Sequence, residues 1–173
     1  AIEHAISGRQ LRLGAMVASG ASVAWLQQNI LKGEQSVDQL SKDAQDVAPG
    51  SEGLIFLPYM MGERSPIWHT NARGVFFGLS LTTTPAMMFR AVLEGTAFAL
   101  AHNVEIGKAS GIKIDEIRSI GGGSKSGLWN QIKADVLGMP IAVLEDSVGA
   151  AVGDAYLAGM GVGLFKDIRQ TLK

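Results

Sequence analysis

Ile120-Gly121-Gly122-Gly123-Ser124-Lys125-Ser126 is the stretch of this sequence that says most about its fold, because it joins a predicted strand to a predicted helix. The strand is expected at Ile114 to Ile120. The helix is expected at Leu128 to Leu137, with Ser124 or Ser126 as its N-cap. Glycines leave backbone N–H groups uncovered at the positive end of a helix dipole. The turn is therefore expected either to support a phosphate or the flat edge of a nucleotide, or to be purely structural.

Two known nucleotide motifs come close to this turn. Aligning Lys125-Ser126 with the end of the Gly-x-x-x-x-Gly-Lys-Ser/Thr phosphate loop puts serines where both glycines belong, which excludes that motif. The dinucleotide fingerprint Gly-x-Gly-x-x-Gly is matched at its first two glycines by Gly121 and Gly123, and an acidic residue, Glu145 or Asp146, follows at about the right distance. Ser126, however, stands in the third glycine position. An NAD-binding oxidoreductase module stays open as an alternative.

The rest of the chain alternates predicted strands and helices over 173 residues, with no linker that would divide residues 1–173 into two domains. Further strands are expected at Arg9–Val17, Leu54–Leu57, Gly74–Leu81 and Ile141–Leu144. Further helices are expected at Ser22–Leu31 and Gly149–Gly161, with a last turn or two at Phe165–Leu172. Another helix is expected after the N-cap Ser36, which has capping-box spacing to Gln39. A long helix is expected from Pro85, which follows the N-cap Thr84, to about Lys108. This order predicts the α/β class, with a parallel or mixed sheet and flanking helices.

The composition excludes several classes of function. Fifteen basic and 16 acidic residues leave a net charge of −1, so no attraction to nucleic acid or anionic lipid is expected. The absence of cysteine excludes a disulfide scaffold and a thiolate metal site. No apolar stretch is long enough to span a bilayer, and the start does not look like a signal peptide. The expectation is a soluble cytoplasmic protein.

Five blocks of the sequence, in order, resemble the second half of the FGGY family of carbohydrate kinases. They are LPYMMGERSP with NARGVFFGL (57–66 and 71–79), RAVLEG (90–95), GGGSKSGLWNQ (121–131), ADVLGMP (134–140) and GAAVGDA (149–155). The likeness covers roughly residues 53–164 and extends more weakly to about Ile6. Gly-Glu-Arg-Ser-Pro and Leu-Trp-Asn-Gln are most similar to xylulokinases.

The resemblance implies an actin-like (ribonuclease H-like) ATPase lobe, with ATP and Mg²⁺ used in the cleft between two lobes. It implies that Gly122, Gly123 and Ser124 line the adenine and ribose, with Ser126 and Asn130 as further polar contacts. The parent protein would phosphorylate a small sugar, with D-xylulose as first choice and gluconate, ribulose and glycerol as alternatives.

The departures from the family pattern matter as much as the matches. The family's catalytic aspartate, one phosphate-binding loop and the sugar-binding lobe all precede the recognisable blocks. The isolated chain is therefore expected to be inactive, with no catalytic residue and no assigned metal ligand. Met87 stands where the family usually has a polar residue. A non-catalytic binding domain stays open as an alternative, and exposed sheet edges predict self-association.

The other chemically suggestive residues are expected to be structural. Glu63 and Arg64 are interpreted as an ion pair or a solvated loop, and Arg90 and Glu94 as a pair on one helix face. The histidines lack partners at metal-ligand spacing. Ordinary structural roles are also expected of His102, Asp135 and Asp154. The methionine pairs Met60-Met61 and Met87-Met88 are expected to belong to the core.

Overall fold

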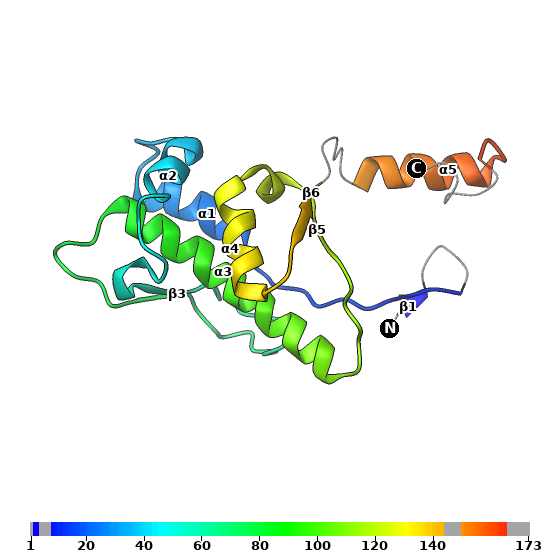
Figure 1. Cartoon of the computed structure of the whole chain (residues 1–173), viewed down its shortest axis with the longest axis horizontal. Helices are drawn as coiled ribbons and strands as arrows, with labels where there is room; N and C mark the ends of the chain where they lie inside the picture. Colours follow the sequence, from blue (N-terminus) through cyan, green and yellow to red (C-terminus); the bar gives the residue numbers. More distant parts are fainter. Residues whose placement is uncertain (1, 4–7, 144–149, 166–173) are drawn as a thin grey trace.

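The long helix α3 (Pro85–Ala109) forms the centre of the molecule, for which a computed structural model describes residues 2–3, 8–143 and 150–165 (Figure 1). Its predicted start is confirmed, because the Thr84 hydroxyl accepts a hydrogen bond from the Met87 N–H at 3.2 Å and Pro85 occupies the first turn. The Met87 sulfur in turn accepts from the Thr84 N–H at 3.4 Å. The residue that departs from the family pattern therefore completes the cap.

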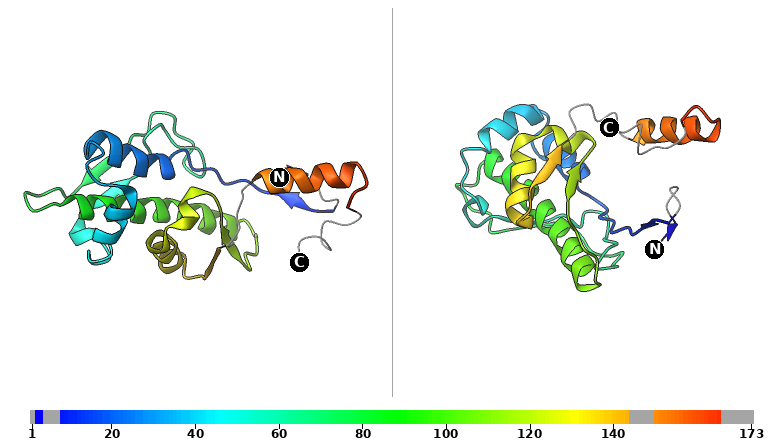
Figure 2. Two further views of the ribbon diagram at one scale, coloured as in Figure 1. Left: turned by 90° about the horizontal axis from the view of Figure 1, so that it is seen from above. Right: turned by 45° about the vertical axis from the view of Figure 1, so that its right-hand side comes forward.

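Two short helical segments precede α3 and pack on it (Figure 2). The first is α1 (Gly20–Trp25), which continues as a π-helical turn over Leu26–Ile30, and the second is α2 (Val37–Asp43). Ser36 caps α2 as predicted, with its hydroxyl accepting from the Gln39 N–H at 3.1 Å. The Gln39 side chain donates to Asp43 at 2.7 Å, so it does not complete the predicted capping box. A 3₁₀ turn, Ser51–Gly53, follows.

The strands are shorter than predicted, and within the described residues they form three separate two-stranded sheets. β3 (Ile55–Leu57) pairs antiparallel with β4 (Val75–Phe77), with Phe56 opposite Phe76. β5 (Ile117–Ser119) pairs parallel with β6 (Ile141–Val143). Parallel and antiparallel pairing therefore both occur, although in separate sheets.

The predicted strand at residues 9–17 is wrong for most of its length. Only β2 (Gln10–Leu11) forms, and it pairs antiparallel with β1 (Ile2–Glu3). The backbone of residues 15–17 is held by a loop instead: the Ser65 N–H donates to the Ala15 carbonyl at 3.1 Å, and the Val17 N–H donates to the Glu63 carboxylate at 3.0 Å. The Glu63 side chain thus accepts from a backbone N–H that a ladder would pair with a neighbouring strand.

After α3, the part of the chain that the structure describes contains two further α-helices. In α4 (Gly127–Leu137) the predicted ends are confirmed, since Ser126 is the N-cap and Gly138 follows in the left-handed region at φ +61°. The second helix, α5 (Ala150–Gly161), lies apart from α1–α4 in both views of Figure 2. Of the predicted final turn, residues 166–172 lie outside the described residues, as do Leu144 and Gly149. No helix in the described ranges is long and apolar enough to cross a membrane.

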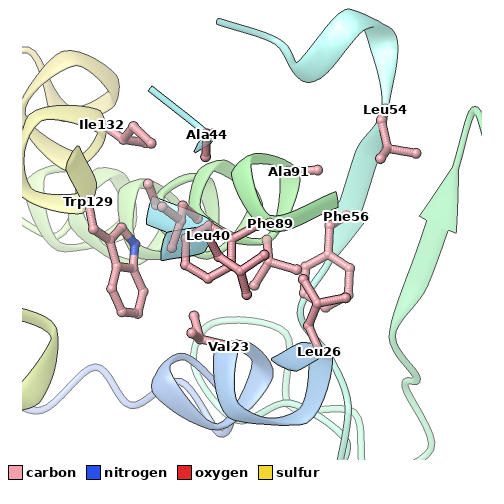
Figure 3. Close-up of a cluster of buried hydrophobic side chains, with 13 residues drawn as sticks. Val23, Leu26, Leu40, Ala44, Leu54, Phe56, Phe89, Ala91, Trp129 and Ile132 are labelled. Carbon is pink, nitrogen blue, oxygen red and sulfur yellow. The ribbon is translucent and has the colours of Figure 1, made fainter. Parts of the chain in front are cut away.

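The hydrophobic core lies where α1, α2, β3 and α4 meet the first half of α3 (Figure 3). Its most buried members include Leu26, Leu40, Phe56, Phe89 and Val92. Met60, Met87 and Met88 pack against this cluster as predicted. The prediction is wrong for Met61, whose side chain is 75 % exposed to solvent. Met61 lies between Met60 and Gly62, which are joined by a β-bridge.

A buried ion pair fastens α3 to the segment before β3. The Arg90 Nε donates to Glu94 at 2.8 Å, which confirms the predicted pair, and both residues are less than 10 % exposed. Glu94 also accepts from the Gly50 N–H at 3.1 Å and from the Ser51 hydroxyl at 3.0 Å. Both carboxylate oxygens of Glu94 therefore have a hydrogen-bond donor, as a buried charge requires.

Candidate functional site

A cavity of about 580 Å³ opens beside the glycine turn, at the carboxyl end of the parallel strand β5. Most of its wall is apolar and comes from segments far apart in the sequence, namely the start of α1, the middle of α3, both strands β5 and β6, and α4. These apolar side chains are Met16, Ala97, Leu100, Ile117, Ile120, Trp129 and Ile141. Such a cavity suits a flat, largely apolar group.

The glycine turn presents backbone to this cavity. Gly121 has φ +81°, which a side chain would strain, and a 3₁₀ turn from Gly122 to Lys125 follows it. Gly122 and Gly123 both line the cavity. A Cβ added to Gly122 would meet nothing within 4 Å, whereas one added to Gly123 would lie 3.0 Å from the Trp129 ring. The first glycine therefore leaves room for a ligand, and the second leaves room for the tryptophan.

The three polar residues predicted to contact a nucleotide make hydrogen bonds within the turn. The Ser124 hydroxyl is buried and donates to the Gly121 carbonyl at 2.7 Å. The Ser126 hydroxyl accepts from the Trp129 N–H at 3.2 Å, and the Asn130 side chain donates to the Ser124 carbonyl at 2.7 Å. None of Ser124, Ser126 and Asn130 is among the described residues that line the cavity. Their effect on a ligand would pass through the shape of the turn.

Lys133 is a cavity residue that the sequence reasoning missed. Its ammonium group donates to the Ser119 hydroxyl at 3.2 Å and to the Asn130 side-chain oxygen at 3.1 Å, and it lies 4.9 Å from the centre of the Trp129 ring. Burial lowers the pKa of Lys133. Its spacing of three and four residues from Asn130 and Trp129 places all three on one side of α4, and that spacing is the signal that could have identified it.

Ser19, Gly20 and Thr96 also line the cavity and were not predicted. Ser19 and Gly20 begin α1, and the Thr96 hydroxyl donates back to the Val92 and Leu93 carbonyls of its own helix. No local sequence pattern marks these positions, because they reach the cavity only through the packing of α1 against α3.

Arg118 is the other cation at the cavity wall, and its charge is already paired. Its guanidinium group donates to Glu116 at 2.9 and 3.0 Å. This hydrogen bond, with the attraction between the charges, raises the pKa of Arg118 and lowers that of Glu116. Both side chains are more than half exposed, so the pair adds little to stability.

Glu63 was interpreted as part of an ion pair or a solvated loop, and this is wrong. The residue is only 4 % exposed, and its Oε1 accepts from the Val17 N–H at 3.0 Å and from the Arg64 N–H at 2.7 Å. The partner of the carboxylate is backbone, not the Arg64 side chain. Burial, and secondly the charge of Glu63, raise the pKa of Tyr59. Glu63 thus holds the segment that leads to Ser19 at the cavity wall.

The remaining candidates carry no chemistry in the described ranges. No group of three or more His, Asp or Glu side chains there is placed to hold a metal ion. His102 is exposed on α3, and His4 lies outside the described residues. Asp135 accepts from the Gln131 side chain at 2.7 Å, which agrees with the structural role expected of it.

Comparison with known proteins gives one family over most of the chain. The family described as "FGGY family of carbohydrate kinases, C-terminal domain" matches residues 7–162. A xylulose kinase of Staphylococcus epidermidis is 35 % identical over 170 residues, which cover 98 % of this chain and 34 % of that protein. A glycerol kinase of Deinococcus radiodurans is 35 % identical over 156 residues, which cover 88 % of this chain and 30 % of that protein.

Solved structures give the same picture. The xylulose kinase from Rhodospirillum rubrum superposes with a TM-score of 0.75 at 37 % identity, covering 87 % of this chain and 30 % of that one. A gluconate kinase from Lactobacillus acidophilus superposes with a TM-score of 0.76 at 32 % identity, and the match covers 89 % of this chain and 31 % of that one. The matched domain has the actin-like ATPase fold, which confirms the predicted fold class. The chain spans about a third of the length of the curated relatives it matches.

Proposed function

The chain belongs to the FGGY family of carbohydrate kinases, and we propose that it forms the C-terminal part of the nucleotide-binding lobe of a longer, ATP-dependent sugar kinase. One observation carries the proposal. Gly122 and Gly123 line an apolar cavity of about 580 Å³ at the carboxyl end of a parallel strand. In open α/β folds this end of the strands is where ligands bind.

The cavity fits a nucleotide in size and in chemistry. Its volume is within the range of about 300–1,000 Å³ that is common for small-molecule sites. An adenine ring would lie against the apolar side chains, and the sugar would approach the bare backbone of Gly122 and Gly123. Ser124, Ser126 and Asn130 would act by fixing the turn in the conformation that exposes this backbone.

In the proposed reaction, the bond between the γ-phosphorus of ATP and its bridging oxygen breaks while a sugar hydroxyl oxygen bonds to that phosphorus. The hydroxyl proton passes to a base that we place outside this chain, in keeping with the family's order of motifs. Mg²⁺ would neutralise charge on the phosphates. The described residues include no cluster fit to hold it, so its ligands are placed outside them as well. The role of this chain is to bind and orient the nucleotide.

D-xylulose is the first choice of sugar. Xylulose kinases from Staphylococcus epidermidis, Bacillus subtilis and Escherichia coli are 32–35 % identical to this chain. Gluconate, ribulose and glycerol are the alternatives, and similar proteins include a gluconate kinase and glycerol kinases. The residues that read the sugar would come mainly from the sugar-binding lobe of the same polypeptide.

The alternative of an NAD-binding module is disfavoured by the geometry of the turn. The third position of the dinucleotide fingerprint needs a glycine for close packing of strand and helix. Ser126 occupies it and caps α4 with its side chain, which is a task that glycine cannot perform. A binding domain without catalysis would keep the cavity but give no product.

The kinase proposal is tested by joining this chain to its sugar-binding lobe and measuring ADP release with each of the four substrates. D-xylulose is expected to give the highest kcat/KM. A Gly122→Ala variant is expected to raise the KM for ATP and to leave the KM for the sugar unchanged, since the added methyl group reaches only the cavity. If no substrate is phosphorylated at the expense of ATP, the proposed function is wrong.

A further inference from the structure

Lys133 brings an uncompensated positive charge to the wall of the cavity. A lysine ammonium group has three N–H donors and no acceptor. Two donors are used, by the Ser119 hydroxyl at 3.2 Å and by the Asn130 side-chain oxygen at 3.1 Å. One donor is left over, on a half-buried group that lines the cavity.

The partners that Lys133 has are all neutral. A hydroxyl, an amide oxygen and the face of the Trp129 ring, 4.9 Å away, each attract the ammonium group, but none carries a full negative charge. Within the described part of the chain, no carboxylate forms an ion pair with it. The other cation at the wall, Arg118, has such a partner in Glu116. Lys133 is therefore the cation there that an incoming anion would compensate.

Burial makes the need for an anion greater. Removing the ammonium group from water disfavours its charged form, as the lowered pKa of Lys133 indicates. A charge-assisted hydrogen bond to a phosphate oxygen is about twice as strong as one between neutral groups. A nucleoside alone would leave the ammonium group as it is, with neutral partners only.

The position of Lys133 relates it to the glycine turn. Its partner Ser119 is the last residue of β5, and its partner Asn130 holds the Ser124 carbonyl inside the turn. Lys133 thus lines the same cavity as Gly122 and Gly123. A nucleotide whose ribose rests on these glycines carries its first phosphate next to the ribose, and no other part of the nucleotide near the glycines is anionic.

The geometry points to Lys133 as the residue that binds the first phosphate of the nucleotide, through the N–H that Ser119 and Asn130 leave free. This inference rests on the proposed function, because it requires a nucleotide in the cavity. The inference goes beyond the proposed function because it names a specific contact through which the site would bind nucleotides more tightly than nucleosides. In the intact kinase, this contact would contribute equally to the binding of ATP and ADP.

The test compares the binding of adenosine, AMP and ATP by calorimetry for the chain and its Lys133→Met variant. Methionine keeps the length of the side chain and removes the charge. AMP and ATP are expected to bind about tenfold more weakly to the variant, since a hydrogen bond between charged groups is worth roughly a factor of ten or more. Adenosine is expected to bind within about twofold of the unaltered chain, because it has no phosphate. Lys133→Arg is expected to keep most of the affinity for AMP.

Lys125→Met is the matched control, since Lys125 belongs to the same turn but is exposed and lies outside the cavity wall. It should leave all three affinities unchanged. Inorganic phosphate alone is expected to bind far more weakly than AMP, and binding as tight as that of AMP would identify a free-phosphate site and overturn the inference.

The outcomes separate the two proposals. If Lys133→Met weakens the binding of adenosine as much as that of AMP, or weakens the binding of neither, the phosphate contact is refuted while the nucleotide site stands. If the unaltered chain binds none of the three, the nucleotide site itself is refuted, and the role of Lys133 with it.

Discussion

We expect Gly122→Ala and Gly123→Ala to change the stability of the chain in opposite directions, although the two glycines are neighbours in one turn. Neither has a positive φ, so an alanine can adopt the backbone conformation at both. The difference lies in what the new methyl group meets. At Gly122 it meets nothing within 4 Å, and at Gly123 it lies 3.0 Å from Cζ3 and 3.3 Å from Cε3 of Trp129.

The magnitudes follow from two opposing effects. Replacing glycine by alanine in a compatible conformation stabilises a protein by about 0.4–1 kcal/mol through the unfolded chain. This is the whole effect expected for Gly122→Ala. Overpacking costs about 1–3 kcal/mol when the neighbour cannot move, and Trp129 is 8 % exposed and belongs to the core. With an overlap of a few tenths of an ångström, the net loss expected for Gly123→Ala is about 0.5–1.5 kcal/mol.

The measurement is urea unfolding of both variants, followed by circular dichroism, with thermal unfolding as a second readout. A gap of about 1–2 kcal/mol between the variants corresponds to roughly 2–8 °C in Tm for a chain of this length. Gly122→Ala should also weaken ATP binding, because its methyl group enters the cavity. Equal stability of the two variants, or a more stable Gly123→Ala, would refute the packing of Trp129 on Gly123.

Three further predictions concern the elements that carry the site. Glu94→Ala should lower the free energy of unfolding by about 3–5 kcal/mol, because Arg90 is left buried without its partner. Alanine substitution of the exposed Glu105 on the same helix is the control. A loss below about 1 kcal/mol for Glu94→Ala would contradict the buried pair. Ser126→Ala should cost about 1 kcal/mol by removing the N-cap of α4, while Ser126→Asp, which can also cap, should restore most of it; chemical denaturation of all three forms decides. Burial lowers the pKa of Lys133 in the folded chain below the 10.5 of a free side chain. Between the folded and the unfolded pKa the unfolded chain binds more protons, so the free energy of unfolding should rise with pH in that window. A Lys133→Met variant that shows the same rise would contradict Lys133 as its origin.

Features set by a few neighbouring residues could be predicted from the sequence. Thr84 with Pro85 defines the start of α3, and Ser126 with Gly138 defines both ends of α4, because a cap depends only on residues within one turn. The predicted strand at residues 9–17 failed because strand formation depends on a distant partner. The loop around Glu63 supplies a carboxylate to this segment where a ladder would need a strand.

The candidate site divides in the same way. The glycine turn could be found because its signal is local. The opposite wall of the cavity comes from α1 and α3, which lie about 100 and 25 residues earlier in the chain and meet the turn only through packing. The predicted polar contacts were assigned from residue type, but the structure uses Ser124, Ser126 and Asn130 to satisfy groups within the turn itself. Residue type alone does not distinguish a side chain that contacts a ligand from one that stabilises a turn.

The claim that most needs testing is that the cavity beside the glycine turn binds ATP. The direct measurement is a titration of the ¹⁵N-labelled chain with ATP and, separately, with NAD, followed by the backbone amide resonances. Saturable shifts are expected with ATP at Gly122 and Gly123 and in α4 as far as Lys133, and none of comparable size with NAD. Amides of the turn that stay unmoved by ATP, or that move with NAD alone, would contradict it.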